Sequence, residues 1–164
     1  MGVDRGGTLS TGTNATTFEA LFRERFDPMV RLASLLTGDH HVAEELTMDA
    51  FERVAPRLDD IEHPAAYVRA AVINAARSHH RRRALDARLP VPVEPTPTDH
   101  RVDELWDRLG ELRPDERACV VLRFYEDLPL AAIAEQLDLP LGTVKSHIHR
   151  ALATLRTVLT EEDR

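Results

Sequence analysis

Apolar residues recur along most of this chain at spacings of three and four, which is the period of an amphipathic helix. The stripes that follow this period lie within residues 18–32, 42–54, 67–76, 105–112, 114–124, 130–137 and 144–159. Pro56 is expected to end the second of these helices, because proline lacks a backbone donor and clashes with the preceding turn. No stretch alternates convincingly between apolar and polar residues, so the sequence predicts an all-α fold.

Prolines divide these helices into two groups. Residues 84–101 (ALDARLPVPVEPTPTDHR) carry prolines at positions 90, 92, 95 and 97, a density that forbids a continuous helix and favours an extended linker. The opening residues 1–17 are rich in Gly and Thr and are predicted to form a flexible tail. The sequence therefore predicts two small helical domains, at 18–83 and 102–164, joined by a proline-rich linker.

The charges are distributed unevenly along the chain. The net charge of -7 at first argues against a nucleic-acid binder. However, the stretch from Pro64 to Arg83 contains five arginines and no acid. The stretch from Leu139 to Thr160 contains Lys145, Arg150 and Arg156, again without an acid. Two basic patches in an acidic protein allow it to hold phosphates at two places.

Composition excludes several other classes of protein. No apolar run approaches the ~20 residues of a membrane span, and the N-terminus lacks the apolar stretch of a signal peptide. Cys119 is the single cysteine, so no disulfide forms within the chain, and its apolar neighbours favour a place in the core. The eight histidines lack the four-residue spacing of helical metal ligands, so neither a metal nor a cofactor is expected. These features suit a soluble cytoplasmic protein.

The last two helices have the pattern of a helix-turn-helix. The first is predicted at Leu130–Leu137, with the small Ala134 where the helices must approach closely, and Asp138 tolerates the left-handed turn that follows. Pro140 and Gly142 mark the start of the second helix. Its first two turns expose Thr143, Lys145, Ser146, His147, His149 and Arg150. A recognition helix reads base edges with such residues and holds phosphates with its basic ones, although an ordinary helical hairpin has the same spacing.

The segment from Leu112 to Leu152 resembles region 4 of bacterial sigma factors of the extracytoplasmic-function group. The matching elements are Leu112, Pro114 and Arg117, the run LRFYEDL, the pair Ile133-Ala134 and the run GTVKSHIHRAL. The resemblance implies that the helix-turn-helix reads the minus-thirty-five promoter element. Response regulators contain the same helix-turn-helix, so the first domain has to separate the two classes.

The run HVAEELTMDAFERV (residues 41–54) is predicted to form an acidic amphipathic helix. Its charge alone indicates only a face exposed to solvent. It resembles region 2.2, with which sigma factors bind the clamp of the polymerase. The resemblance implies polymerase-binding roles for Glu44, Glu45, Asp49 and Phe51. Met48 stands where the family usually has Gln, which removes one polar contact from the acidic face.

The run PAAYVRAAVINAARSHHRRR (residues 64–83) places polar and basic residues on one helix face. The face is formed by Asn74, Arg77, Ser78, Arg81, Arg82 and Arg83. A separated DNA strand needs such a basic track, together with polar groups that hold unstacked bases. The run resembles regions 2.3 and 2.4, which bind the non-template strand of the minus-ten element; Tyr67 replaces the usual Trp and Ser78 a frequent Asp.

The resemblance implies a non-enzymatic initiation factor with a region 2 bundle and a region 4 helix-turn-helix. Its expected partners are core RNA polymerase and promoter DNA at both elements, without insertion into a membrane. Many members of the family are held inactive by an anti-sigma protein, which is a further candidate partner. A free-standing regulator with a helical dimerisation domain is a competing hypothesis, but it leaves the Asn74–Arg83 face unexplained. A small helical enzyme is another, for which the sequence offers no catalytic constellation.

Overall fold

A computed structural model of the chain describes residues 10–86 and 107–162, with side chains described at 17–85 and 107–156. The regular elements of these ranges are α1 (Ser10–Thr37), α2 (His40–Val54), the 3-10 helix η1 (Ala55–Asp60), α3 (Pro64–Asp86), α5 (Pro114–Phe124), α6 (Leu130–Leu137) and α7 (Leu141–Glu162). Residues 107–110 add one helical turn before α5. The described residues contain helices and no strand, which confirms the all-α prediction.

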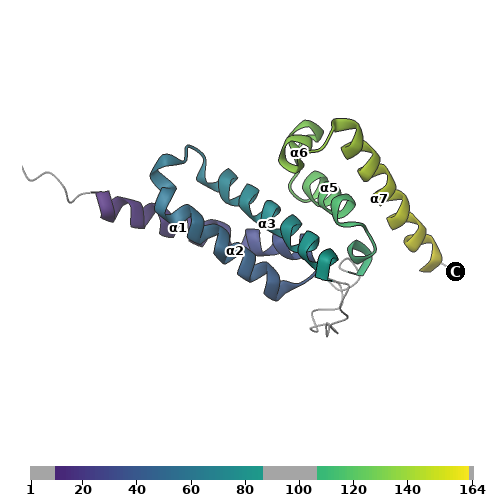
Figure 1. Cartoon of the computed structure of the whole chain (residues 1–164), viewed down its shortest axis with the longest axis horizontal. Coiled ribbons are helices and arrows are strands. Elements are labelled where there is room, and N and C mark those ends of the chain that lie inside the picture. The colour runs from purple at the N-terminus through teal and green to yellow at the C-terminus, as the bar shows by residue number, and fades with distance from the viewer. Residues whose placement is uncertain (1–9, 87–106, 163–164) are drawn as a thin grey trace, which may run out of the picture.

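The elements α1, α2, η1 and α3 form one group, here called the first bundle, and α5, α6 and α7 form the second bundle (Figure 1).

The start of α2 follows from local chemistry. Gly38 ends α1 with a φ of +76°, a conformation that glycine adopts without steric cost. Asp39 then caps α2, since its carboxylate accepts a hydrogen bond from the backbone N of Val42 at 3.0 Å.

Aromatic rings fill one end of the first bundle. Phe51 of α2 is fully buried and lies 5.0 Å from the ring of Phe22 and 5.9 Å from that of Phe26, both on α1. Phe18 approaches the same ring edge-on at 6.3 Å. Aromatic side chains bury large apolar areas, so this cluster makes a major contribution to the packing of α2 against α1.

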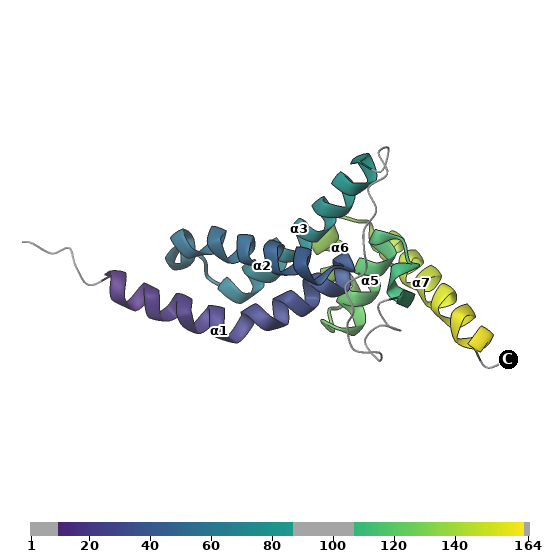
Figure 2. The same ribbon diagram turned by 90° about the horizontal axis from the view of Figure 1, so that it is seen from below.

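The second bundle encloses a smaller core. Leu122 on α5 and Ile133 and Leu137 on α6 are fully buried, as are Val144 and Ala151 on α7. The expected inward positions of Ile133, Leu137, Val144 and Ala151 are therefore confirmed. In Figures 1 and 2, α7 runs past α5 and its C-terminal end points away from the first bundle.

Two predicted boundaries were wrong. The predicted tail extended to residue 17, whereas α1 begins at Ser10, and the predicted linker began at residue 84, whereas α3 continues to Asp86. Once a helix is nucleated by packing, each further residue adds a hydrogen bond at small cost, so a weak local propensity does not stop it. The rest of the predicted tail (1–9) and linker (87–101) lies outside the described residues. Across the described helices, none is long and apolar enough to cross a bilayer.

Candidate DNA-binding and polymerase-binding surfaces

The turn between α6 and α7 has the predicted left-handed residue. Asp138 has φ 52° and ψ 51°, and the backbone N of Leu139 donates to the carbonyl oxygen of Ala134 at 2.9 Å. The carbonyl oxygen of Pro140 then accepts from the backbone N of Thr143 at 2.9 Å, which opens the first turn of α7. This short, tightly bonded turn fixes α7 at the surface of the second bundle.

The predicted contact residues of α7 lie on its accessible side. Lys145, Ser146, His149 and Arg150 are exposed, while Thr143 and His147 are half-buried. The Ser146 hydroxyl donates to the carbonyl oxygen of Gly142 at 2.9 Å, so toward another molecule it presents chiefly an acceptor. The face therefore offers one lysine, one arginine and two imidazoles within two helical turns.

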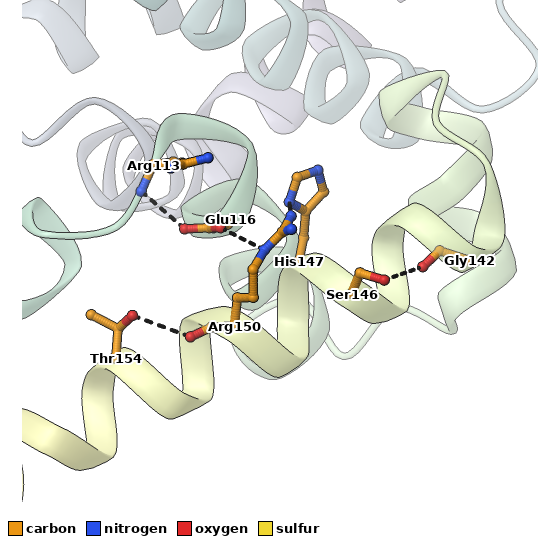
Figure 3. Close-up of polar contacts among 7 residues, drawn as sticks. All are labelled: Arg113, Glu116, Gly142, Ser146, His147, Arg150 and Thr154. Carbon is orange, nitrogen blue, oxygen red and sulfur yellow. Dashed lines mark hydrogen bonds and ion pairs between the residues drawn. The ribbon is translucent and has the colours of Figure 1, made fainter.

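Arg150 is anchored by a residue that the sequence reasoning missed. Its Nε donates to the carboxylate of Glu116 on α5 at 3.0 Å, and one of its terminal nitrogens lies 2.8 Å from Nδ1 of His147 (Figure 3). Glu116 and Arg150 are 34 residues apart, so no local pattern relates them. The only hint in the sequence is an acid in the first turn of a helix, which by itself indicates capping.

The residues on the polar face of α3 differ in their contacts: most are exposed, and one is bonded to the second bundle. Asn74, Arg81, Arg82 and Arg83 are exposed, and Arg81 donates to the hydroxyl of Ser78 at 3.0 Å. Arg77 instead turns toward the second bundle. Its Nη1 donates to the carbonyl oxygen of Leu137 at 2.7 Å, and its Nη2 lies 3.4 Å from the carboxylate of Asp115. In this arrangement Arg77 is therefore bound within the chain.

Other contacts also join the two bundles. Arg69 on α3 pairs with Glu126 at 3.5 Å, and Arg117 on α5 donates to the carbonyl oxygen of Leu36 on α1 at 3.4 Å. Burial lowers the pKa of Arg117. A hollow of about 420 Å³ remains between the bundles, lined by Arg77, His80, Arg81, Ala84, Arg113, Pro114, Asp115 and His147. Residues of both predicted DNA faces thus line the same hollow.

The predicted acidic face of α2 is present at the surface. Glu44, Glu45 and Asp49 are exposed, and Met48, with 41% of its surface accessible, lies among them. Glu44 and Glu45 each approach a histidine one turn earlier, at 3.4 Å. The expected contact from Phe51 was wrong, because its ring is fully buried in the core of the first bundle. A helix has an inner and an outer face, and the position of Phe51 falls on the inner one.

Besides Arg117, two further titratable groups have shifted pKa values. Burial lowers the pKa of His79 on α3, and the nearby His80 and Arg83 lower it further. Burial raises the pKa of the Cys119 thiol to about 11, with a further contribution from Asp115. Within the described residues, no three His, Cys, Asp or Glu side chains lie close enough to hold a metal ion.

Comparison with known proteins agrees with this geometry. The family described as "Sigma-70, region 4" matches residues 103–155, which include the helix-turn-helix. The RNA polymerase sigma-E factor of Streptomyces coelicolor is 36% identical, over 89% of this chain and 88% of that protein. The ECF RNA polymerase sigma factor SigL of Mycobacterium tuberculosis is 30% identical, over 93% and 94%. The chain belongs to the extracytoplasmic-function family of RNA polymerase sigma factors.

Solved structures agree on the fold. The sigma factor RpoE of Bartonella quintana, in complex with the anti-sigma factor NepR, aligns with a TM-score of 0.72 at 20% identity, over 88% of this chain and 97% of that one. CnrH, in complex with the cytosolic domain of CnrY, aligns with a TM-score of 0.66 at 22% identity, over 92% of each chain.

Proposed function

We propose that this protein directs core RNA polymerase to specific promoters in the cytoplasm and initiates transcription there. The first bundle binds the polymerase through α2 and the melted minus-ten strand through α3. The second bundle reads the minus-thirty-five duplex through α7. The observation that carries the proposal is that one chain presents two basic faces on different helices, Asn74–Arg83 on α3 and Thr143–Arg150 on α7, together with an acidic face on α2. A free-standing regulator would need only the face on α7.

The exposed residues of α7 divide by chemistry. Lys145 and Arg150 carry the positive charge that holds phosphates, while His147 and His149 carry ring nitrogens that can bond to base edges. Thr143 and Ser146 add hydroxyls at the start of the helix, where recognition helices contact DNA.

The exposed residues of α3 suit a single strand. The side-chain amide of Asn74 can bond to the edge of an unstacked base, while Arg81, Arg82 and Arg83 follow the phosphates. Arg77 joins this track only after it leaves its partners in the second bundle.

The acidic face of α2 is assigned to the polymerase. Three exposed carboxylates favour a basic surface on the partner, and Met48 supplies an apolar centre within them. Negative charge on this side also weakens the attraction of the free protein for DNA, so promoter binding depends on the polymerase. An anti-sigma protein that covers one or both bundles is a further expected partner.

The proposal is tested with purified core polymerase. The full chain should co-purify with core enzyme and support transcription that depends on a promoter. Failure to associate with core would contradict the proposal, and a dimer that binds duplex DNA alone would favour a free-standing regulator.

The two DNA roles are separated by a pair of variants. Arg81→Ala should slow promoter opening by roughly tenfold and leave binding to the minus-thirty-five duplex intact, because Arg81 contacts only the melted strand. Lys145→Ala should weaken duplex binding and spare initiation on a premelted template, which needs no opening step. Equal effects of both variants on both steps would contradict this division.

A further inference from the structure

A buried carboxylate lies beneath the proposed reading face of α7. The side chain of Glu116 is only 8% exposed, and its two oxygens have different partners. One accepts from Nε of Arg150 at 3.0 Å, and the other accepts from the backbone N of Arg113 at 3.4 Å. A carboxylate at this depth is tolerated because it is paired and hydrogen-bonded. Glu116 thus offers Arg150 an acceptor that is itself held by a second hydrogen bond.

The contact between Arg150 and His147 determines which ring nitrogen of the imidazole accepts a hydrogen bond. A guanidinium group has only donors, so the 2.8 Å contact requires Nδ1 of His147 to accept. The proton of the neutral ring then resides on Nε2. In Figure 3 the Arg150 guanidinium lies between the Glu116 carboxylate and the His147 ring, so the three groups form a continuous chain.

We propose that Glu116 is a positioning residue for sequence reading by His147. Glu116 holds Arg150, and Arg150 keeps His147 in the form that donates from Nε2. In the major groove this donor selects a base that presents an acceptor, guanine above all, and rejects cytosine, which presents only a donor. The inference rests on the proposed role of α7 at the minus-thirty-five duplex.

An opposite role for Glu116 would be to withhold Arg150 from DNA. The structure favours positioning, because the Arg150 side chain remains 53% exposed while it is bonded to Glu116. The two roles predict different effects on DNA binding when Glu116 is removed. Removal of a positioning residue lowers discrimination between sequences, whereas removal of a restraint strengthens binding to DNA of any sequence.

The test uses holoenzyme assembled from core polymerase and the full chain. The probe is a DNA with a premelted downstream segment of fixed sequence and a duplex window randomised over the minus-thirty-five region. Sequencing of the bound fraction gives the base preference at each position. For the wild-type protein we expect one position at which cytosine is depleted.

Glu116→Ala and His147→Ala should each reduce the base preference at that same position, with roughly tenfold less discrimination against cytosine. The double variant should show no further loss, because both residues act through one contact. Glu116→Gln should retain the preference, since its amide oxygen can still accept from Arg150. Glu111→Ala is the matched control, because Glu111 is an exposed acid near the same end of α5.

Several outcomes would overturn the inference. An unchanged profile for Glu116→Ala would do so, as would stronger binding to all sequences. If Glu116→Ala lowered the base preference equally at every position and also lowered the midpoint of thermal unfolding, the role of Glu116 would be structural only. If the wild-type protein neither joins core nor enriches any sequence, the proposed function itself has failed, and the wild-type profile shows this before any variant is compared.

Discussion

Met48 and Phe51 lie within one turn of α2 and have opposite environments. Phe51 is fully buried among the rings of Phe18, Phe22 and Phe26, whereas Met48 is exposed between carboxylates. The sequence motif alone does not distinguish a contact residue from a core residue, because both recur in the same run. Burial separates them, and it leaves Met48 rather than Phe51 available for the proposed polymerase contact.

Phe51→Ala should lower the free energy of unfolding by about 3–5 kcal/mol, the usual effect of removing a buried ring and leaving a cavity. Met48→Ala should change it by less than about 0.5 kcal/mol and weaken binding to core polymerase instead. Urea unfolding followed by circular dichroism gives the first quantity, and a core-binding titration gives the second. A stable Phe51→Ala protein with impaired core binding would contradict this assignment.

Cys119 is expected to be nearly inert in the folded protein. Its pKa of about 11, against an ordinary value of 9.0, leaves roughly a hundredfold less thiolate at pH 8, and its side chain is fully buried. Labelling with a thiol reagent should therefore proceed only through opening of the second bundle and should accelerate with urea. Rapid labelling in native buffer, at the rate of a free thiol, would contradict the buried position.

At the scale of elements, the acidic outer face of α2 carries the next prediction. Reversing two of its charges with Glu44→Lys and Asp49→Lys should weaken association with core by roughly tenfold or more and reduce the dependence of binding on salt. Glu24→Lys combined with Asp27→Lys, both on the exposed side of α1, makes the same change of charge elsewhere and should have little effect. Equal losses for both sites would indicate a general effect of net charge.

Some elements of the fold are predictable from the local sequence, and others are not. The helix-turn-helix was predictable, because its spacing, its small Ala134 and its left-handed Asp138 are local features. The start of α1 and the end of α3 were not, because helices extend by propagation. The Glu116–Arg150 pair and the contact of Arg77 with Leu137 join residues 34 and 60 positions apart, so they arise only when helices pack.

At the scale of the molecule, the two bundles touch in a way that the proposed reading of two promoter elements does not permit. The two promoter elements lie about 25 base pairs apart, which corresponds to roughly 85 Å of duplex at 3.4 Å per base pair. Here Arg77 of the proposed strand-binding face is bonded to Leu137 and Asp115 of the second bundle. The proposed function therefore requires the bundles to separate, and separation frees Arg77 for the melted strand.

This requirement gives the last prediction. Asp115→Asn combined with Glu126→Gln removes the carboxylates that pair with Arg77 and Arg69 across the bundles, while neither position belongs to a proposed DNA or polymerase face. Two such pairs contribute about 0.2–1 kcal/mol each, so the population of the open form should rise roughly twofold or more. Energy transfer between dyes on Glu52→Cys and Glu135→Cys, both exposed positions, should fall.

Association with core should accelerate by a similar factor, because a larger fraction of the protein is already open. Asp127→Asn is the control, since Asp127 pairs with Arg123 inside the second bundle. It should leave both energy transfer and association unchanged. If the double variant behaves like this control in both measurements, the contacts between the bundles do not restrain opening. A fall in energy transfer without faster association would mean instead that opening does not limit the encounter with polymerase.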